Sequence, residues 1–292
     1  MHIPVLLDEI VNGLEIKDKE VVFDGTLGEG GHSKKFLESA KDVSLVGTDA
    51  DKKALAKTKE NLKDVSGKKF LYEMNFRKVD EALKNAGLEK IDKALLDLGF
   101  SSNQIDGDDR GFSFMKDSPL VMTYEQNPGK ETTTAYDVVN HWSEENLKTI
   151  IEAYGEEKNA WKIAKAIVAK RHEGEIKTSG QLRELIEKVS KRKGKINPAT
   201  KTFQAIRIAV NDEIRALEEA IHKIFFLLNP KGKMAIISFH SIEDRVVKRF
   251  FKEKEKEGLG KQTTKKPIIA GEEELKTNPR ARSAKLRIFE KN

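Results

Sequence analysis

Short apolar runs alternate with stretches of helical pattern over the first hundred residues of this 292-residue chain. The runs EVVFDGT, SLVGTD, KFLYEMNF and KALLDLGF begin at residues 20, 44, 69 and 93, and enough chain for a helix separates each from the next. This rhythm is typical of βαβ units whose parallel strands are covered on both faces. We therefore predict an α/β fold that begins with four parallel strands.

The alternation stops near residue 100, and helical patterns without a clear strand follow. Residues 101–120 are rich in Gly, Asp and Ser. The stretch KNAWKIAKAIVAKR at 158–171 has helical periodicity, with Trp161, Ala164 and Val168 on one face. This block predicts a helical domain inserted between the fourth and fifth strands.

A long helix and a return to the α/β pattern follow the helical block. Asn197 and Pro198 predict the start of this helix, and NPKG at 229–232 predicts its end. The apolar positions between them step by three or four: Phe203, Ile206, Val210, Ile214, Leu217, Ile221, Ile224 and Leu228. The strand-like KMAIISFH, the helical SIEDRVVKRFFKEK and two candidate strands around 263–270 and 284–291 come next.

These elements predict one α/β core interrupted by a helical insertion. The predicted core has a seven-stranded, mostly parallel sheet and consists of residues 1–111 and 207–292, with the insertion at 112–206. The length agrees, because 292 residues are long for one domain and short for two.

The stretch VVFDGTLGEGGHS at 21–33 predicts a ligand-binding turn between a strand and a helix. It holds four glycines, Gly25, Gly28, Gly30 and Gly31. Glycines let backbone N–H groups approach a ligand closely. Asp24 ends the first strand, and Asp49 ends the second, where a carboxylate can accept hydrogen bonds from both hydroxyls of a ribose. A turn that only tightens a strand–helix connection explains one or two glycines, but not four with acids on both flanks.

The turn does not have the dinucleotide-binding pattern G-x-G-x-x-G. Counting from Gly28, Ser33 stands where the third glycine is needed. A strand, DGTLGEGG, a helix and a second acid are closer to the turn that binds S-adenosylmethionine, in which no pyrophosphate needs the helix terminus.

Asp97 and Phe100 in DLGF are candidates for methyl transfer to an amino group. Asp97 ends the fourth predicted strand, beside the ligand crevice of an open α/β sheet. Acceptors for the N–H groups of an exocyclic amine can turn its lone pair toward a sulfonium methyl, and an aromatic ring can stack on the base. The alternatives are a helix cap for Asp97 and core packing for Phe100.

The stretch SFHSIEDR at 238–245 predicts a second polar cluster at the same sheet edge. Ser238 and His240 are its candidates, and we expect substrate positioning rather than proton transfer from His240. Ser241 and Asp244 also fit an ordinary helix cap with a first-turn acid. His32 and His240 have no further histidine or cysteine at ligand spacing, so we expect no metal site.

Charge is concentrated in two segments, although the net charge is only +6. Residues 158–207 hold fourteen basic against four acidic side chains, and residues 261–292 hold nine against four. Such segments fit a polyanion partner and a solvated surface about equally. The absence of cysteine, of a basic leader and of a long apolar run predicts a soluble cytoplasmic protein without membrane contact.

Eight blocks, taken in order, resemble the signatures of the MraW/RsmH family of 16S rRNA (cytosine-N(4))-methyltransferases. They are HIPVLLDE, DGTLGEGGHS, LDLGFSSNQID, DRGFSFM, AYGEE, TFQAIRIAVNDE, ISFHSIEDR and NPRARSAKLR. The resemblance runs from His2 to Arg287. It implies a Rossmann-like class I methyltransferase core, S-adenosylmethionine as cofactor and an inserted substrate-recognition domain. The implied substrate is a cytidine in the P-site region of 16S rRNA, within the small ribosomal subunit.

Matching positions carry the family's roles onto this chain. The implied cofactor contacts are Asp24, Gly28, Gly30, Gly31, His32, Asp49, Phe76, Asp97 and Gln104. The implied catalytic positions are Asp97, Phe100, Ser238 and His240. The candidates for RNA phosphates are Lys191, Arg192, Lys193, Lys195, Arg280, Arg282, Lys285 and Arg287.

One block departs from the family pattern, and two other function classes stay open. Where the family usually reads GPLDMRMD, this chain reads SPLVMTYE, with Val121 and Thr123 in place of an acid and an arginine. A nicotinamide-dependent dehydrogenase is disfavoured by the broken glycine pattern. A non-catalytic RNA-binding or ribosome-assembly factor could keep the fold, and the sequence leaves a monomer or a homodimer open.

Overall fold

The computed structural model describes residues 3–99, 109–113, 115–125, 128–129, 131–190 and 197–292. The chain forms two compact units, one of Met1–Ser101 with Ile214–Asn292 and the other of Ser102–Glu213. The sequence placed the divisions after residues 111 and 206 instead. Assignment of the second unit to substrate recognition stays a prediction.

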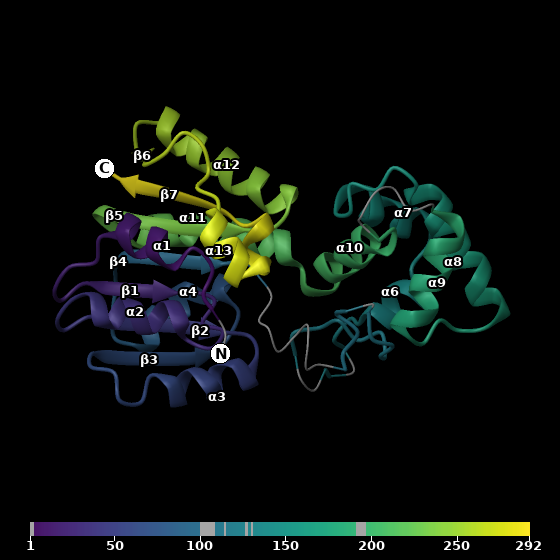
Figure 1. Ribbon diagram of the computed structural model, residues 1–292, viewed down its shortest axis with the longest axis horizontal. Coiled ribbons are helices and arrows are strands. Elements are labelled where there is room, and N and C mark those ends of the chain that lie inside the picture. Colours follow the sequence, from purple (N-terminus) through teal and green to yellow (C-terminus); the bar gives the residue numbers. More distant parts are fainter. Residues whose placement is uncertain (1–2, 100–108, 114, 126–127, 130, 191–196) are drawn as a thin grey trace. The chain divides into compact units, whose positions relative to one another are not determined.

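The first unit is built on one seven-stranded sheet, as predicted (Figure 1). Its strands are β1 (Val21–Asp24), β2 (Ser44–Asp49), β3 (Lys68–Glu73), β4 (Ile91–Asp97), β5 (Leu228–Ser238), β6 (Gly260–Gln262) and β7 (Lys285–Lys291). Their order is β3-β2-β1-β4-β5-β7-β6; the first five strands run parallel, and β7 is antiparallel to both β5 and β6. The direction of chain progression reverses between β1 and β4, which makes the carboxyl ends of these strands the expected ligand crevice.

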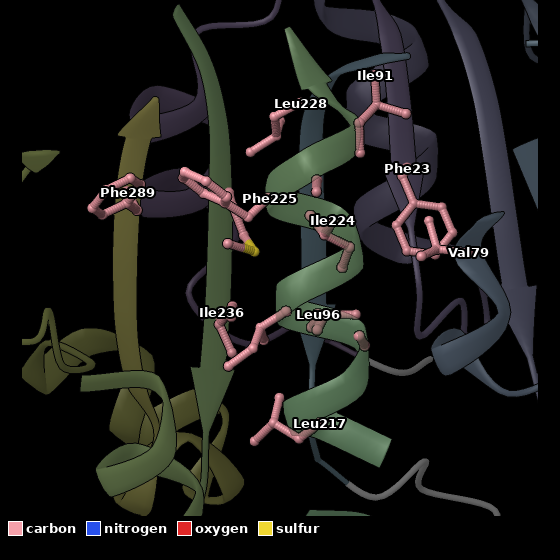
Figure 2. Packing of buried hydrophobic residues seen from close by; sticks show 14 of the residues in the cluster. Phe23, Val79, Ile91, Leu96, Leu217, Ile224, Phe225, Leu228, Ile236 and Phe289 are labelled. Atoms are coloured by element: carbon pink, nitrogen blue, oxygen red, sulfur yellow. The ribbon is translucent and has the colours of Figure 1, made fainter. Parts of the chain in front are cut away.

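Helices cover both faces of this sheet. They are α1 (Leu7–Leu14), α2 (Gly31–Ser39), α3 (Lys52–Asn61), α4 (Val79–Asn85), α11 (Glu213–Leu227), α12 (Ser241–Lys256) and α13 (Glu272–Thr277), with short 3₁₀ helices η1 (Phe76–Lys78) and η2 (Pro279–Ser283). Successive strand residues face opposite sides. Phe23 and Leu96 lie in one buried cluster with residues of α4, α11 and α12, and Figure 2 shows them beside α11. Val22 and Leu95 lie in a second cluster with residues of α1 and α2.

The second unit is helical and has its own core. Its helices are α6 (Ala135–His141), α7 (Glu144–Ala153), α8 (Ala160–Glu173), α9 (Ser179–Val189) and α10 (Ala199–Asn211). Leu147, Ile163, Leu182 and Ile206 lie in one buried cluster with side chains from all five helices. No helix in the described part of the chain is long and apolar enough to cross a membrane.

The predicted long helix is two helices. Asp212 adopts a left-handed conformation, with φ of 50°, at the end of α10, and α11 begins at the next residue. Apolar side chains continue to step by three or four through the break, so the pattern did not reveal it. The predicted division after residue 206 falls inside α10, whereas the compact units divide after Glu213.

Two further sequence predictions differ from the structure. The sixth strand is Gly260–Gln262 rather than 263–270, of which Ile268 forms an isolated bridge to Leu286. On α8, Ala164 is buried, but Trp161 is 52% exposed, because the buried face is formed by Ala160, Ile163, Ala164 and Ile167. Trp161 therefore does not belong to the core.

Candidate active site

Asp24 stabilises the glycine turn after β1 through hydrogen bonds to both ends of the turn. This buried carboxylate accepts hydrogen bonds from the Ser33 hydroxyl at 2.6 Å and from the Thr26 N–H at 3.1 Å. Burial raises the pKa of Asp24, and these hydrogen bonds oppose that rise. Asp24 thus shapes the turn from inside, between the end of β1 and the first turn of α2.

Gly30 and Gly31 meet steric limits that exclude other residues. Gly30 has φ of +80°, and an added Cβ would lie 3.0 Å from the Thr58 methyl group. A Cβ on Gly31 would lie 2.4 Å from the Pro4 ring. The glycines therefore let the turn pack closely between α3 and the N-terminal segment, which is a structural requirement in addition to any ligand contact.

Asp49 at the end of β2 contacts the same turn. Its carboxylate accepts the Gly28 N–H at 2.8 Å and the Asp51 N–H at 2.8 Å. Burial raises the pKa of Asp49 to about 6, although both hydrogen bonds act in the opposite direction. A carboxylate has about four acceptor positions, so capacity remains for the two ribose hydroxyls that the sequence assigned to Asp49.

Phe76 begins η1, directly after β3, and lies beside the turn. The Asn75 side chain caps this short helix by accepting the Arg77 N–H at 3.0 Å. A Cβ added to Gly25 would lie 2.9 Å from the Phe76 Cβ, so the absence of a side chain at Gly25 lets Phe76 approach. This is the position from which an aromatic side chain can form one wall of a site at the ends of β1 and β2.

Asp97 at the end of β4 joins the turn to α2. Its N–H donates to the Thr26 hydroxyl at 2.6 Å, and its Oδ1 accepts the Gly99 N–H at 3.3 Å. Its Oδ2 lies 3.9 Å from Nδ1 of His32, and 17% of its side chain is exposed. The structure therefore brings together Asp97, His32 and the glycine turn, as the sequence predicted for neighbouring strand ends.

His32 is held neutral in this cluster. Burial lowers the pKa of His32, and its Nε2 lies 2.9 Å from the Val5 carbonyl oxygen. A carbonyl only accepts hydrogen bonds, so Nε2 carries the proton and Nδ1 has a lone pair. Nδ1 and the Asp97 carboxylate are then two acceptors 3.9 Å apart, an arrangement that suits a donor group of a ligand.

His240 caps α12, and Ser241, which the sequence offered as an alternative cap, is the first helical residue. The Glu243 N–H donates to Nδ1 of His240 at 3.4 Å, and Oε2 of Glu243 accepts the N–H of Phe239 at 2.8 Å. Nε2 of His240 lies 2.9 Å from Oε1 of Glu243. Nδ1 thus accepts the hydrogen bond of the cap, whereas the buried Nε2 makes no hydrogen bond to a described residue. The positioning role of His240 stays a prediction.

Ser238 ends β5, and the basic residues Lys285 and Arg287 lie on the neighbouring strand β7. Ser238 is buried, with its hydroxyl 3.4 Å from the Lys285 carbonyl oxygen. Arg287 is also buried and pairs with Asp244 at 2.7 Å, while Lys285 lies 3.6 Å from the same carboxylate. The geometry of Arg287 thus does not fit the predicted phosphate contact, because its charge is already neutralised inside the protein.

Arg280 and Arg282 are exposed, and Arg282 lines a cavity. The cavity has a volume of about 290 Å³, and Phe239, His240 and Lys285 also line it. The remaining predicted positions, Phe100, Gln104, Lys191, Arg192, Lys193 and Lys195, lie outside the described residues.

Sequence reasoning missed two polar partners in the site. They are Thr26 and Ser33, which bind Asp97 and Asp24, respectively. The pairing of Thr26 with Asp97 depends on the packing of β1 beside β4, and the pairing of Ser33 with Asp24 depends on the path of the turn between β1 and α2, so neither has a simple sequence signal.

Comparisons with known proteins agree over the whole chain. The model of the MraW methylase family matches residues 1–292. Ribosomal RNA small subunit methyltransferase H of Clostridium botulinum (strain Kyoto / Type A2) is 44% identical, over 99% of this chain and 98% of its own length. The protein of the same name from Clostridioides difficile (strain 630) is 41% identical, with the same coverage.

Proposed function

The chain belongs to the MraW methylase family, and on that premise we propose that it methylates the exocyclic N(4) amino group of a cytidine in the P-site region of 16S rRNA. S-adenosylmethionine is the methyl donor in this methylase family. The proposed substrate is the RNA within the small ribosomal subunit, which would place the enzyme in the cytoplasm.

The observation that carries the proposal is the meeting of Asp97 with the glycine turn. Asp97 binds Thr26 of the turn and lies 3.9 Å from His32, at the point where the strand order reverses. A cofactor in this crevice would contact Asp49 through its ribose and Phe76 through its adenine. The ammonium group of its methionine moiety can donate to Nδ1 of His32 and to the Asp97 carboxylate.

Asp97 can instead accept a hydrogen bond from the target amine. This role turns the nitrogen lone pair out of the ring plane and toward the sulfonium methyl. The two roles of Asp97 compete for the same two carboxylate oxygens. If each oxygen accepts from one of the two donors, Asp97 contacts both cofactor and substrate.

Catalysis in this proposal rests on alignment. Holding amine, methyl carbon and sulfur in line can supply roughly 7 to 11 kcal/mol of a bimolecular barrier. The methylated nitrogen is acidic enough to lose its proton to water or a carboxylate, so the reaction needs no strong base. The engagement of His240 with Glu243 agrees with this requirement.

The test is methyl transfer to small subunits that lack the modification. Purified protein is incubated with methyl-labelled S-adenosylmethionine and these subunits, and the labelled nucleoside is identified by mass after digestion. We expect label on N(4) of one cytidine. Asp97→Asn should lower the rate of methyl transfer at least about a hundredfold. Glu73 is an exposed acid at the end of β3, so the control variant Glu73→Gln should keep the wild-type rate.

The main alternative is a non-catalytic RNA-binding or assembly factor with the same fold. Undiminished subunit binding without any methyl transfer, by protein that still binds the cofactor, would favour that alternative. Methylation that survives Asp97→Asn unchanged would remove Asp97 from the active site and leave the reaction to other residues.

A further inference from the structure

The outward face of α8 combines an aromatic ring with positive charge. Its exposed residues at helical spacing are Trp161, Lys162, Lys165, Ala169 and His172, which we call the Trp161 face. These five positions include no acidic side chain; Glu173, an exposed acid at the end of α8, pairs with Lys170 at 3.0 Å. The opposite side of the helix is buried in the core of the second unit.

Trp161 lies outside the buried core that the described residues of the second unit form. Its side chain is 52% exposed, and the buried cluster of the second unit includes its neighbours Ala160 and Ile163 but not Trp161 itself. Its recorded ring contact is with Lys165, whose Nζ lies 5.5 Å from the ring centroid. A cation held over an exposed indole places charge and a stacking surface at the same point.

This combination fits single-stranded RNA better than other polyanions. Ammonium groups bind backbone phosphates, and an unpaired base stacks on an aromatic ring. An acidic protein surface would pair with the lysines but offers no general partner for the indole. A duplex would likewise pair with the lysines, but its stacked bases are not accessible to the ring.

The start of α8 lies beside the end of α9. Nδ2 of Asn159 donates to the Ser190 hydroxyl at 3.2 Å, and the two helices lie side by side in the second unit (Figure 1). Trp161 follows Asn159 by two residues, and Ser190 immediately precedes the basic run predicted to contact phosphates. That run lies outside the described residues and is not part of the surface proposed here.

We propose that the Trp161 face binds an unpaired segment of the substrate RNA. Trp161 stacks on one base, and Lys162 and Lys165 pair with neighbouring phosphates. The inference rests on an RNA substrate, as proposed above, and adds a contact surface that is separate from the methyl-transfer site.

Intrinsic fluorescence gives a direct test, because the chain has only two tryptophans. The variant Trp142→Phe retains Trp161 as the single emitter. We expect a single-stranded oligoribonucleotide to quench it through base stacking, and a duplex of the same length to quench it much less. Stronger quenching by poly-glutamate than by the single strand would overturn the choice of RNA as partner.

Affinity variants separate stacking from charge. Trp161→Ala should weaken single-strand binding about tenfold without changing its salt dependence, and Trp161→Phe should recover most of the loss. Lys162→Gln with Lys165→Gln should reduce the slope of log K against log salt by about 1.4. Lys252→Gln with Lys256→Gln, on exposed positions of α12, is the matched control and should change neither.

The outcomes distinguish this inference from the proposed function. If the Trp161→Ala variant binds RNA as tightly as the wild-type protein, the proposed role of the Trp161 face is wrong, and the proposed methylation is unaffected. Wild-type protein that neither binds RNA nor methylates the small subunit overturns the proposed function itself.

Discussion

The carboxylate of Asp49 accepts a hydrogen bond of 2.8 Å from the backbone N–H of Gly28, which joins the end of β2 to the glycine turn after β1. The same carboxylate is the proposed acceptor for the ribose hydroxyls of the cofactor. One group thus both shapes the turn and binds the ligand, so its protonation affects both roles.

Cofactor affinity should therefore depend on pH through Asp49. Burial raises its pKa from 3.8 to about 6, so the ligand-free protein takes up a proton at Asp49 as the pH falls through 6. A protonated carboxyl has fewer acceptor positions for the ribose, and binding must release this proton. We expect the Kd for S-adenosylmethionine, measured by calorimetry, to be constant above pH 6 and to rise about tenfold per pH unit below it.

Asp49→Asn is the control for this pH dependence. The variant cannot ionise, so its Kd should be higher at pH 7 and constant between pH 5 and 7. Burial lowers the pKa of His32, so its protonation lies at a more acidic pH than that of a free histidine. A wild-type Kd that does not change between pH 5 and 7 would refute the role of Asp49 in binding.

Gly30→Ala should damage the turn. The residue has φ of +80°, and the new Cβ would lie 3.0 Å from the Thr58 methyl group. We expect a loss of about 1–2 kcal/mol in the free energy of unfolding and a weaker affinity for S-adenosylmethionine, measured by denaturant titration and calorimetry. Gly271→Ala is the matched control, because Gly271 has φ of −73° and open space around it. Equal stability of the two variants would contradict the steric argument.

The sequence predicted the strand ends of the site because local patterns determine them. Asp24, Asp49 and Asp97 each end an apolar run, and parallel strands with short connections bring such ends to one edge of the sheet. The glycine turn was recognisable for the same reason. These predictions needed only the order of residues along a strand.

Features that depend on distant packing were not predictable. Arg287 and Asp244 are 43 positions apart, and only the pairing of β7 with β5 brings them together. The break at Asp212 interrupts an apolar pattern that runs on without change. The hydrophobicity of Trp161 does not show whether this side chain lies on the buried or the exposed face of α8. The packing of the neighbouring helices determines which face is buried.

His240 should contribute no proton transfer. Its Nδ1 accepts the Glu243 N–H within the cap of α12, and asparagine is a good residue at a helix N-cap. We expect His240→Asn to keep the melting temperature and the shape of the pH–rate profile, while His240→Leu loses about 1 kcal/mol of stability. If His240→Asn removed one limb of the profile, His240 would be a general base after all.

Substitutions of Arg287 and Arg282 should have different effects, the first on the stability of the protein and the second on its RNA binding. Arg287 is buried and pairs with the partly buried Asp244, so Arg287→Ala leaves this carboxylate with Lys285 at 3.6 Å and should lower the free energy of unfolding by about 2 kcal/mol. Arg282 is exposed beside the cavity, so Arg282→Ala should keep that stability but lower RNA affinity and reduce its salt dependence by about one counterion. Denaturant titration and RNA binding at several salt concentrations measure the two effects. Arg287→Ala with native stability and weakened RNA binding would restore the phosphate contact that the sequence assigned to it.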